Sequence, residues 1–194
     1  YRDAPTLPGV RMNLFRALLA AVLLAATPAS AAELAGVKVP DQVTVAGEAL
    51  ALNGIALRSK FFFKVYVGAL YLPEKTTDAK KVITSDAPKQ VSMTFLRDLD
   101  RRKVADSIVE GFENNSKEQM PTLKARLDRL LGSVRDVKRG DRLVITWIPG
   151  EGTLVETGGE TMKVEGKDFA EALFTVWLGP KPADEDLKRG LLGL

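Results

Sequence analysis

The chain has 194 residues, of which 45% are apolar and 27% charged, a balance typical of a folded protein with a hydrophobic core. It contains neither cysteine nor histidine, which excludes disulfides, thiol catalysis, imidazole-based triads and the usual zinc sites. We expect one folded domain.

The N-terminal region has the pattern of a secretory signal peptide over residues 12–31, "MNLFRALLAAVLLAATPASA". An arginine precedes an apolar run over residues 17–26, and Ala29-Ser30-Ala31 is a small-x-small cleavage signal. We therefore expect residues 1–31 to be upstream sequence and signal peptide, and residues 32–194 to form the mature domain. An exported protein without disulfides fits a bacterial periplasm, and the run is too short for a stable membrane span. A retained N-terminal anchor is the alternative.

The charge of the mature chain gives no argument for nucleic-acid binding. The formal net charge of the whole chain is +3, but residues 1–31 hold three arginines and one aspartate, so 25 basic and 24 acidic residues remain. We expect a small molecule rather than a nucleic acid as partner, while the sequence leaves the oligomeric state open.

Residues 37–72 predict β-strands that open as a meander: "VKV", "VTVAGEALALNG" and "FFFKVYVGALYL", with Asn53-Gly54 as a turn signal. A short helix is expected over residues 77–85. The segment "KQVSMTFLR" then alternates apolar and polar residues, as a half-buried strand does.

Two helices follow, each with an apolar stripe at helical spacing that predicts a face packed on the core. The first stripe is Val104, Ile108 and Phe112, and the second is Met120, Leu123, Leu127 and Leu130. Three more strands, "RLVITWI", "GTLVET" and "ETMKVEG", include a hairpin turn at Gly158-Gly159. A helix beginning near Asp168 and a short last turn close the chain. This order favours an antiparallel α+β fold with helices laid against one face of one sheet.

The stretch "LRSKFFFKVYVGALYL" combines three phenylalanines with basic residues and tyrosines. A regular strand from Leu57 would place Arg58, Lys64 and Tyr66 on one face. Phe61 and Phe63 would lie on the other face, in the core. The first face is either solvated, with long cationic side chains lying over apolar ones, or one wall of a cleft in which Arg58 and Tyr66 meet an amphipathic ligand.

The segment "NGIALRSKFFFKVYVGALYL" resembles the strand pair that carries the catalytic arginine and threonine of chalcone isomerases and chalcone isomerase-like proteins, in particular the secreted bacterial branch. The resemblance continues through "DRRKVADSIVEGFENN" and "ALFTVWLGPKPADEDLKRGLL", and so runs from about Val43 to the C-terminus. It implies the open-faced sandwich of that family, with an antiparallel sheet covered by helices on one face.

The resemblance also implies a set of site residues. Arg58 matches the substrate-orienting arginine, Tyr66 the active-site threonine, and Thr175 the threonine or serine presented to the ligand ring, so these three are the candidates for catalysis. Asp100 and Ser107 stand where the plant enzymes have a tyrosine and an asparagine. The expected ligand-binding set is Arg58, Lys64, Tyr66, Asp100, Ser107 and Thr175.

The family reaction closes a ring when a phenolate adds to an enone of the same molecule, and it implies no metal and no organic cofactor. It requires proximity and a fixed cation. An arginine suits a phenolate, an enolate or a carboxylate, which fits the family members that hold fatty acids without catalysis. Three functions therefore stay open: a periplasmic binding protein for a small amphipathic anion, a cofactor-independent chalcone or enone isomerase, and an interaction module with a vestigial pocket.

Other motifs are interpreted structurally. The glycine-rich "GEGTLVETGGE" lacks the lysine of a phosphate loop and predicts a hairpin. The acidic residues near the first long helix have basic neighbours and predict a solvated helix start rather than a metal site. Trp147 and Trp177 are expected in the core or in a pocket wall.

Overall fold

The computed structural model of the protein describes residues 31–194. The predicted signal peptide lies outside the described residues, apart from Ala31, and its cleavage stays a prediction.

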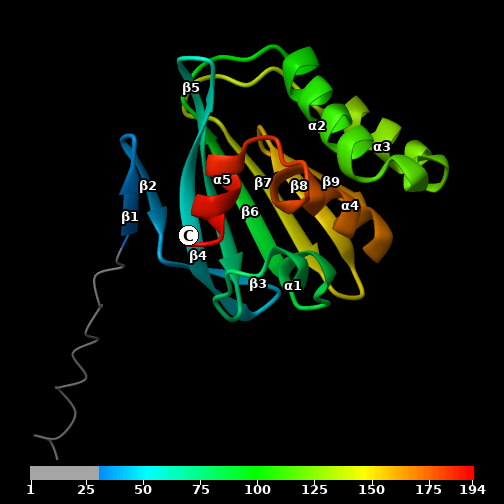
Figure 1. Cartoon of the computed structure of the whole chain (residues 1–194), viewed down its shortest axis with the longest axis horizontal. Helices are drawn as coiled ribbons and strands as arrows, with labels where there is room; N and C mark the ends of the chain where they lie inside the picture. The colour runs from blue at the N-terminus through cyan, green and yellow to red at the C-terminus, as the bar shows by residue number, and fades with distance from the viewer. Residues whose placement is uncertain (1–30) are drawn as a thin grey trace, which may run out of the picture.

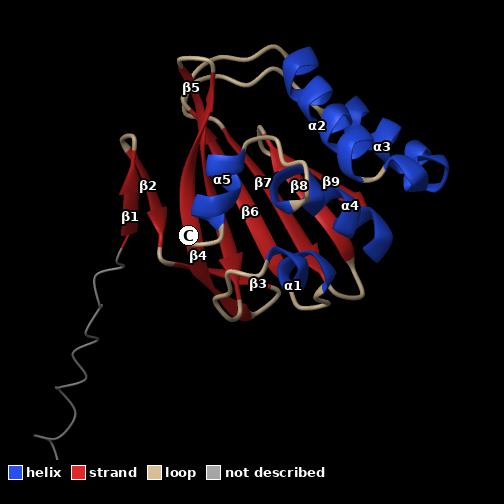
Figure 2. Cartoon of the chain, viewed as in Figure 1, coloured by secondary structure: helices blue, strands red, loops and turns tan. Residues whose placement is uncertain are grey.

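The centre of the fold is a seven-stranded antiparallel sheet in which each strand pairs with the next one along the chain. Figure 2 shows the strands as one curled layer behind the helices. The strands are β3 (Gln42–Val45), β4 (Glu48–Lys60), β5 (Phe63–Leu72), β6 (Lys89–Phe95), β7 (Arg142–Ile148), β8 (Gly152–Thr157) and β9 (Glu160–Val164).

Helices α1, α4 and α5 lie in front of the sheet in Figure 1, and α2 and α3 lie beside them near its upper edge. The helices are α1 (Ala79–Thr84), α2 (Arg101–Asn115), α3 (Met120–Ser133), α4 (Lys167–Leu178) and α5 (Glu185–Leu191), with a short 3-10 turn, η2 (Lys117–Gln119), before α3. This arrangement confirms the predicted α+β fold with helices on an antiparallel sheet.

The helical stripes form much of the main core. Val104, Ile108 and Phe112 of α2 are buried, as are Leu123, Leu127 and Leu130 of α3. Both stripes repeat at intervals of three or four residues, so their side chains lie on one face of each helix and are buried together against the core. The predicted hairpin at Gly158-Gly159 also joins β8 to β9 as expected.

A second, smaller core covers the opposite face of β4 and β5. Leu70 packs in the main core, whereas Ala69 and Tyr71 belong to the second cluster, because successive side chains of a strand point to opposite faces. A separate hairpin of β1 (Ala31–Leu34) and β2 (Val37–Pro40) contributes to this cluster, and the Tyr71 hydroxyl donates to the Pro40 carbonyl at 3.0 Å.

The predicted turn at Asn53-Gly54 is wrong. β4 continues through these residues with an irregularity in its pairing between Leu52 and Gly54. Asn53 is buried, and its amide donates to the Leu191 carbonyl at 2.8 Å. A Cβ on Gly54 would lie 2.2 Å from the Gly190 carbonyl oxygen. Asn53 and Gly54 therefore allow the C-terminal end of α5 to pack closely against the strand. Glycine in a strand often marks such a close approach, and in the sequence the same Asn-Gly pair looks like a turn signal.

The prediction that Phe61 and Phe63 lie in the core is also wrong. Residues 57–72 form a hairpin rather than one strand: Lys60 pairs with Phe63, and Phe61 and Phe62 make the turn. The three phenylalanines are exposed.

No helix within residues 31–194 is both long and apolar enough to cross a membrane.

Candidate functional site

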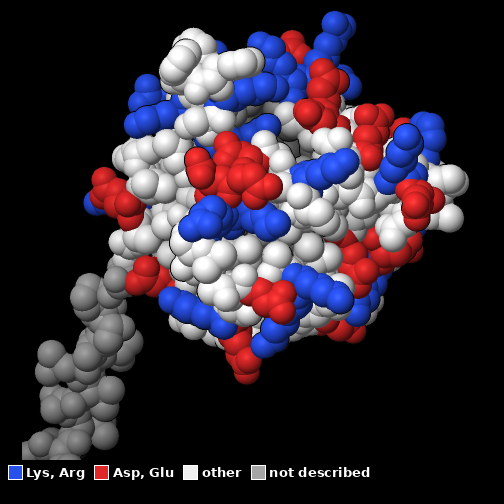
Figure 3. All heavy atoms as spheres, viewed as in Figure 1, with Lys and Arg blue, Asp and Glu red and all other residues white. Residues whose placement is uncertain are grey.

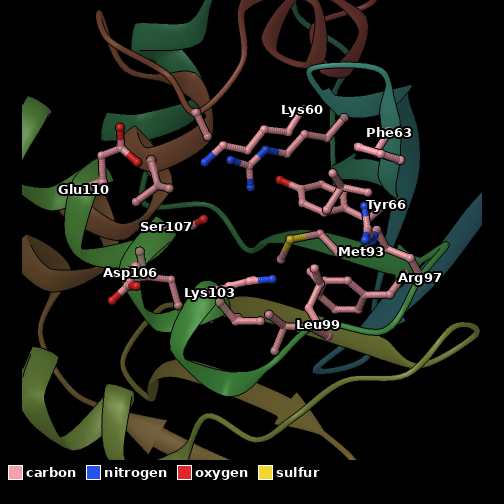
Figure 4. A pocket seen from close by; sticks show the side chains of 18 of the residues that line it. Lys60, Phe63, Tyr66, Met93, Arg97, Leu99, Lys103, Asp106, Ser107 and Glu110 are labelled. Atoms are coloured by element: carbon pink, nitrogen blue, oxygen red, sulfur yellow. The ribbon is translucent and has the colours of Figure 1, made fainter.

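A cavity of about 330 Å³ lies between the upper part of the sheet and the helices, within the range of small-molecule sites, roughly 300–1,000 Å³. Figure 4 shows its labelled side chains converging from the strands and from α2. It is lined by Arg58, Lys60, Phe61, Phe63, Val65, Tyr66, Met93, Phe95, Arg97, Leu99, Lys103, Val104, Asp106, Ser107, Ile108, Glu110, Leu143, Val176, Trp177 and Ala183.

Arg58 and Tyr66 form the polar centre of the cavity. They are direct cross-strand partners on β4 and β5, so the register of the hairpin places the two side chains on the same face. The guanidinium carbon of Arg58 lies 5.6 Å from the centroid of the Tyr66 ring, within the range of a cation–π contact. The sheet thus fixes the position of a cation beside a phenol.

The Tyr66 hydroxyl is oriented by α4. The indole Nε1 of Trp177 donates to this oxygen at 3.0 Å, so the hydroxyl accepts from Trp177 and keeps its own proton for another acceptor. Burial raises the pKa of Tyr66 above its ordinary value of 10.0, against the opposing effect of Arg58. Tyr66 is therefore a neutral donor at physiological pH, and Figure 4 shows its hydroxyl directed into the cavity.

The remaining charged side chains give the cavity an excess of positive charge. Besides Arg58, the lining includes Lys60, Arg97 and Lys103, against Asp106 and Glu110. Figure 4 shows the Lys103 ammonium and the Ser107 hydroxyl pointing into the space that Tyr66 faces. An anion in this space would have several donors within its reach.

The other walls are apolar. Met93 and Phe95 come from β6, Ile108 from α2, and Val176 from α4, and all four are buried. The rings of Tyr66 and Phe95 meet edge to face, with 5.8 Å between their centroids. A ligand with one anionic end and an apolar body matches this distribution of side chains.

The structure brings three of the six predicted site residues to the cavity. Arg58, Tyr66 and Ser107 line it, whereas Lys64, Asp100 and Thr175 do not. The functional roles of all six stay predictions.

The local structure explains why the other three residues lie elsewhere. Lys64 is exposed and pairs with Ser59, beyond a register shift that separates it from the Arg58–Tyr66 pair. Asp100 caps α2 by accepting from the Arg102 amide at 2.7 Å. The Thr175 hydroxyl donates to the Ala172 carbonyl of its own helix at 2.6 Å.

Sequence reasoning missed the basic residues on the far side of the cavity and the role of Trp177. Lys103 was part of a charged helix start, a pattern more typical of a solvated surface. Trp177 was placed in the core or a pocket wall, which its burial confirms, but its bond to Tyr66 joins residues 111 positions apart. No local pattern reports such a contact.

The cavity does not have the donor set of a metal site. No group of three or more acidic side chains close enough to hold a metal ion occurs in the part of the chain that the structure describes. Its chemistry is that of fixed cations and hydroxyl donors beside an apolar wall.

Comparison with known sequences identifies the family. A sequence model described as chalcone isomerase-like matches residues 31–193. The chain belongs to the chalcone isomerase-like family. The match covers β1 to α5 and agrees with the resemblance seen in the β4–β5 hairpin and in α4. No curated protein sequence matches the chain significantly.

Among solved structures, the fold is similar to the crystal structure of a fatty-acid binding protein from Arabidopsis thaliana. The TM-score is 0.65 and the sequence identity 13%, and the match covers 84% of this chain and 96% of the plant chain. At this identity the comparison shows that the two proteins share the chalcone isomerase-like fold.

Proposed function

We propose that this chalcone isomerase-like protein binds a small amphipathic anion, a fatty acid or a phenolic compound, with its anionic head at Arg58. The observation that carries this proposal is the position of Arg58 beside Tyr66, its cross-strand partner, in a cavity whose other walls are largely apolar. The proposal is supported by a solved structure of the same fold, which is that of a fatty-acid binding protein.

The chemistry of the two donors suits a carboxylate or a phenolate. A guanidinium offers two parallel N–H donors to such a group, and charge-assisted hydrogen bonds of this kind are about twice as strong as neutral ones. Tyr66 adds a neutral donor. Its hydroxyl oxygen already accepts a hydrogen bond from Trp177, so its proton is left to donate to the ligand. The apolar body of the ligand would then lie against Met93 and Phe95.

A cofactor-independent isomerase acting on a chalcone or another enone is the second candidate. It is favoured by the same two residues, since a fixed cation and a neutral hydroxyl donor can stabilise the oxyanion that develops as the ring closes. Against it, Asp100 lies outside the cavity lining and caps α2. Of the two helix positions where the plant enzymes have a tyrosine and an asparagine, only the second, Ser107, reaches the cavity. Binding is therefore the better supported function.

Mass spectrometry of small molecules that co-purify with the native protein, followed by an absorbance assay of chalcone loss, distinguishes the candidates. A fatty acid or phenolic compound held without turnover supports the binding protein. Stereoselective turnover at roughly 1 per second or more would make it an isomerase. If neither ligand nor turnover is found, the binding function is wrong and an interaction module with a vestigial pocket remains.

We also propose that the protein acts in the bacterial periplasm. The support is the signal-peptide pattern of residues 12–31 and the absence of cysteine from the sequence. Intact-mass measurement of protein from a periplasmic extract tests this: the expected N-terminus is at or near Ala32. A species that retains residues 12–31 would contradict the proposed location.

A further inference from the structure

The tip of the β4–β5 hairpin presents an apolar group to water. The exposed fractions of Phe61, Phe62 and Phe63 are 85%, 99% and 60%, and Leu194 is the only other large apolar side chain exposed within residues 31–194. Figure 1 shows the hairpin projecting at the upper end of the molecule, and Figure 3 shows an uncharged projection there. Apolar surface gathered at one point in this way commonly marks an interaction site.

The turn contains a phenylalanine in a backbone conformation that this residue type disfavours. Phe61 has a φ of +57°, in the left-handed region that bulky side chains rarely adopt. Two-residue hairpin turns normally place glycine, asparagine or aspartate at a central position with positive φ. Folding alone would favour such a residue, so the phenylalanine points to a function of the tip.

Basic side chains surround the aromatic tip. Lys60, Lys64 and Arg97 are all exposed, and the Arg97 guanidinium carbon lies 4.9 Å from the centroid of the Phe63 ring. None of the three forms an ion pair with another described residue. Figure 3 shows basic side chains below the uncharged projection.

We propose that this tip docks the protein on an anionic phospholipid membrane. The phenylalanines would enter the boundary between headgroups and acyl chains, and the flanking cations would contact the lipid phosphates. Aromatic side chains bordered by lysine and arginine are the combination that binds to such a surface, because apolar burial and attraction to anionic lipids add.

A bilayer fits this tip better than a protein partner. Stable protein interfaces bury about 1,200–2,000 Å² in total, which a projecting two-residue turn does not offer by itself. A membrane needs no complementary shape, and the long stems of Lys60 and Lys64 can lie along the apolar region while their ammonium groups reach the headgroups.

The cavity lies directly beside the tip, since Lys60, Phe61, Phe63 and Arg97 belong to its lining. A docked protein would therefore hold the side of the cavity formed by the hairpin against the membrane. An amphipathic ligand could then enter from the lipid with little exposure of its apolar part to water. This route rests on the proposed function, whereas docking does not depend on the ligand.

The test is co-sedimentation with vesicles of equal parts phosphatidylcholine and phosphatidylglycerol, compared with vesicles of phosphatidylcholine alone. We expect wild-type protein to bind the anionic vesicles more tightly and to bind less at about 1 M salt, where charges are screened within about 3 Å. Phe61→Gly/Phe62→Ser and Lys60→Gln/Lys64→Gln should each weaken binding about tenfold or more.

Matched controls lie elsewhere on the surface. Leu194→Ser removes the other exposed apolar side chain, and Lys75→Gln/Lys80→Gln removes two exposed charges near α1; both variants should bind like wild type. Phe61→Gly alone should melt at the same or a higher temperature than wild type, because glycine relieves the left-handed turn. Weaker membrane binding with unchanged or greater stability separates docking from folding.

Three outcomes would overturn the proposal. One is wild-type protein that does not sediment with anionic vesicles, and another is tip variants that bind as well as wild type. The third is gel filtration in which the tip substitutions convert a dimer into a monomer, since the phenylalanines would then be a contact between two copies. If wild-type protein retains a fatty acid but does not bind to vesicles, docking is refuted and the proposed function is left intact.

Discussion

Trp177 of α4 donates a 3.0 Å hydrogen bond to the hydroxyl of Tyr66 on β5, inside the main core. This contact ties the last long helix to the strand that carries the candidate site. It also sets the role of the Tyr66 hydroxyl in the site. The oxygen already accepts from Trp177, so the hydroxyl proton is left to donate to a ligand. The site therefore depends on the packing of α4 against the sheet.

Tyr66→Phe should lower both stability and ligand affinity. It leaves the buried Trp177 N–H without its acceptor, which costs about 1–3 kcal/mol of unfolding free energy, and it removes a neutral donor, which weakens anion binding about three- to tenfold. Chemical denaturation and titration with a fluorescent fatty acid measure the two effects.

Tyr71→Phe is the matched control, because Tyr71 lies on the opposite face of β5 and donates to the Pro40 carbonyl. It should cost some stability and leave ligand affinity unchanged. Equal losses of affinity in the two variants would mean that Tyr66 contributes through folding alone.

Gly54→Ala should destabilise the protein strongly. The added Cβ would lie 2.2 Å from the Gly190 carbonyl oxygen and 2.5 Å from that of Leu191, so backbone has to shift, at a cost of about 1–3 kcal/mol or more. Gly132→Ala is the control: apart from its own stretch of the α3 backbone, nothing lies within 4 Å of its Cβ position, and alanine should stabilise that helix by about 0.5–1 kcal/mol. Thermal melts that move both variants in the same direction would contradict this.

Lys89 predicts a pH dependence of stability. Its Nζ is buried and donates to three carbonyls at the end of α1, those of Val82, Ile83 and Ser85. Burial lowers the pKa of Lys89 from 10.5 to about 8, partly opposed by Glu171. Between these two pH values the unfolded chain binds more protons than the folded one, so the free energy of unfolding rises with pH there.

The measurement is urea denaturation of wild type and Lys89→Met at pH 7, 9 and 10. The stability of wild type relative to the variant should increase from pH 7 to pH 10, while other titrating groups cancel in the comparison. A difference that stays constant or falls would mean that the three carbonyls hold the ammonium charged throughout this range.

Sequence patterns predicted the elements of this fold where burial follows a period. The stripes of α2 and α3 repeat at helical spacing and proved buried, apart from Met120, which is half-buried. Val91, Met93 and Phe95 of β6 are buried as well. The errors occurred where a local signal had a tertiary cause. Asn53-Gly54 resembles a turn but accommodates α5. The phenylalanine run resembles a core strand, although its first two residues, Phe61 and Phe62, form an exposed turn.

The candidate site was predictable only in part. Arg58 and Tyr66 could be paired because both lie on a segment with a clear family resemblance, and the structure makes them cross-strand partners. Ser107 stands where the plant enzymes have an asparagine, and it does line the cavity. Lys103 and Trp177 reach the same space from other elements, through the packing of helices on the sheet. One-dimensional periodicity contains no information about that packing.

Titration of a fluorescent fatty acid into wild type, Arg58→Lys and Arg58→Ala tests the proposed function most directly, with Arg129→Ala, an exposed arginine of α3, as the control. Arg58→Ala should lose a charge-assisted contact of about 1.5–3 kcal/mol, or roughly 10- to 150-fold in affinity, with an intermediate loss for Arg58→Lys, which keeps the charge without the planar fork. All variants should melt close to wild type, since Arg58 is only half-buried. If Arg58→Ala binds as tightly as wild type and Arg129→Ala, Arg58 does not hold the head of the ligand, and the proposed binding function is wrong.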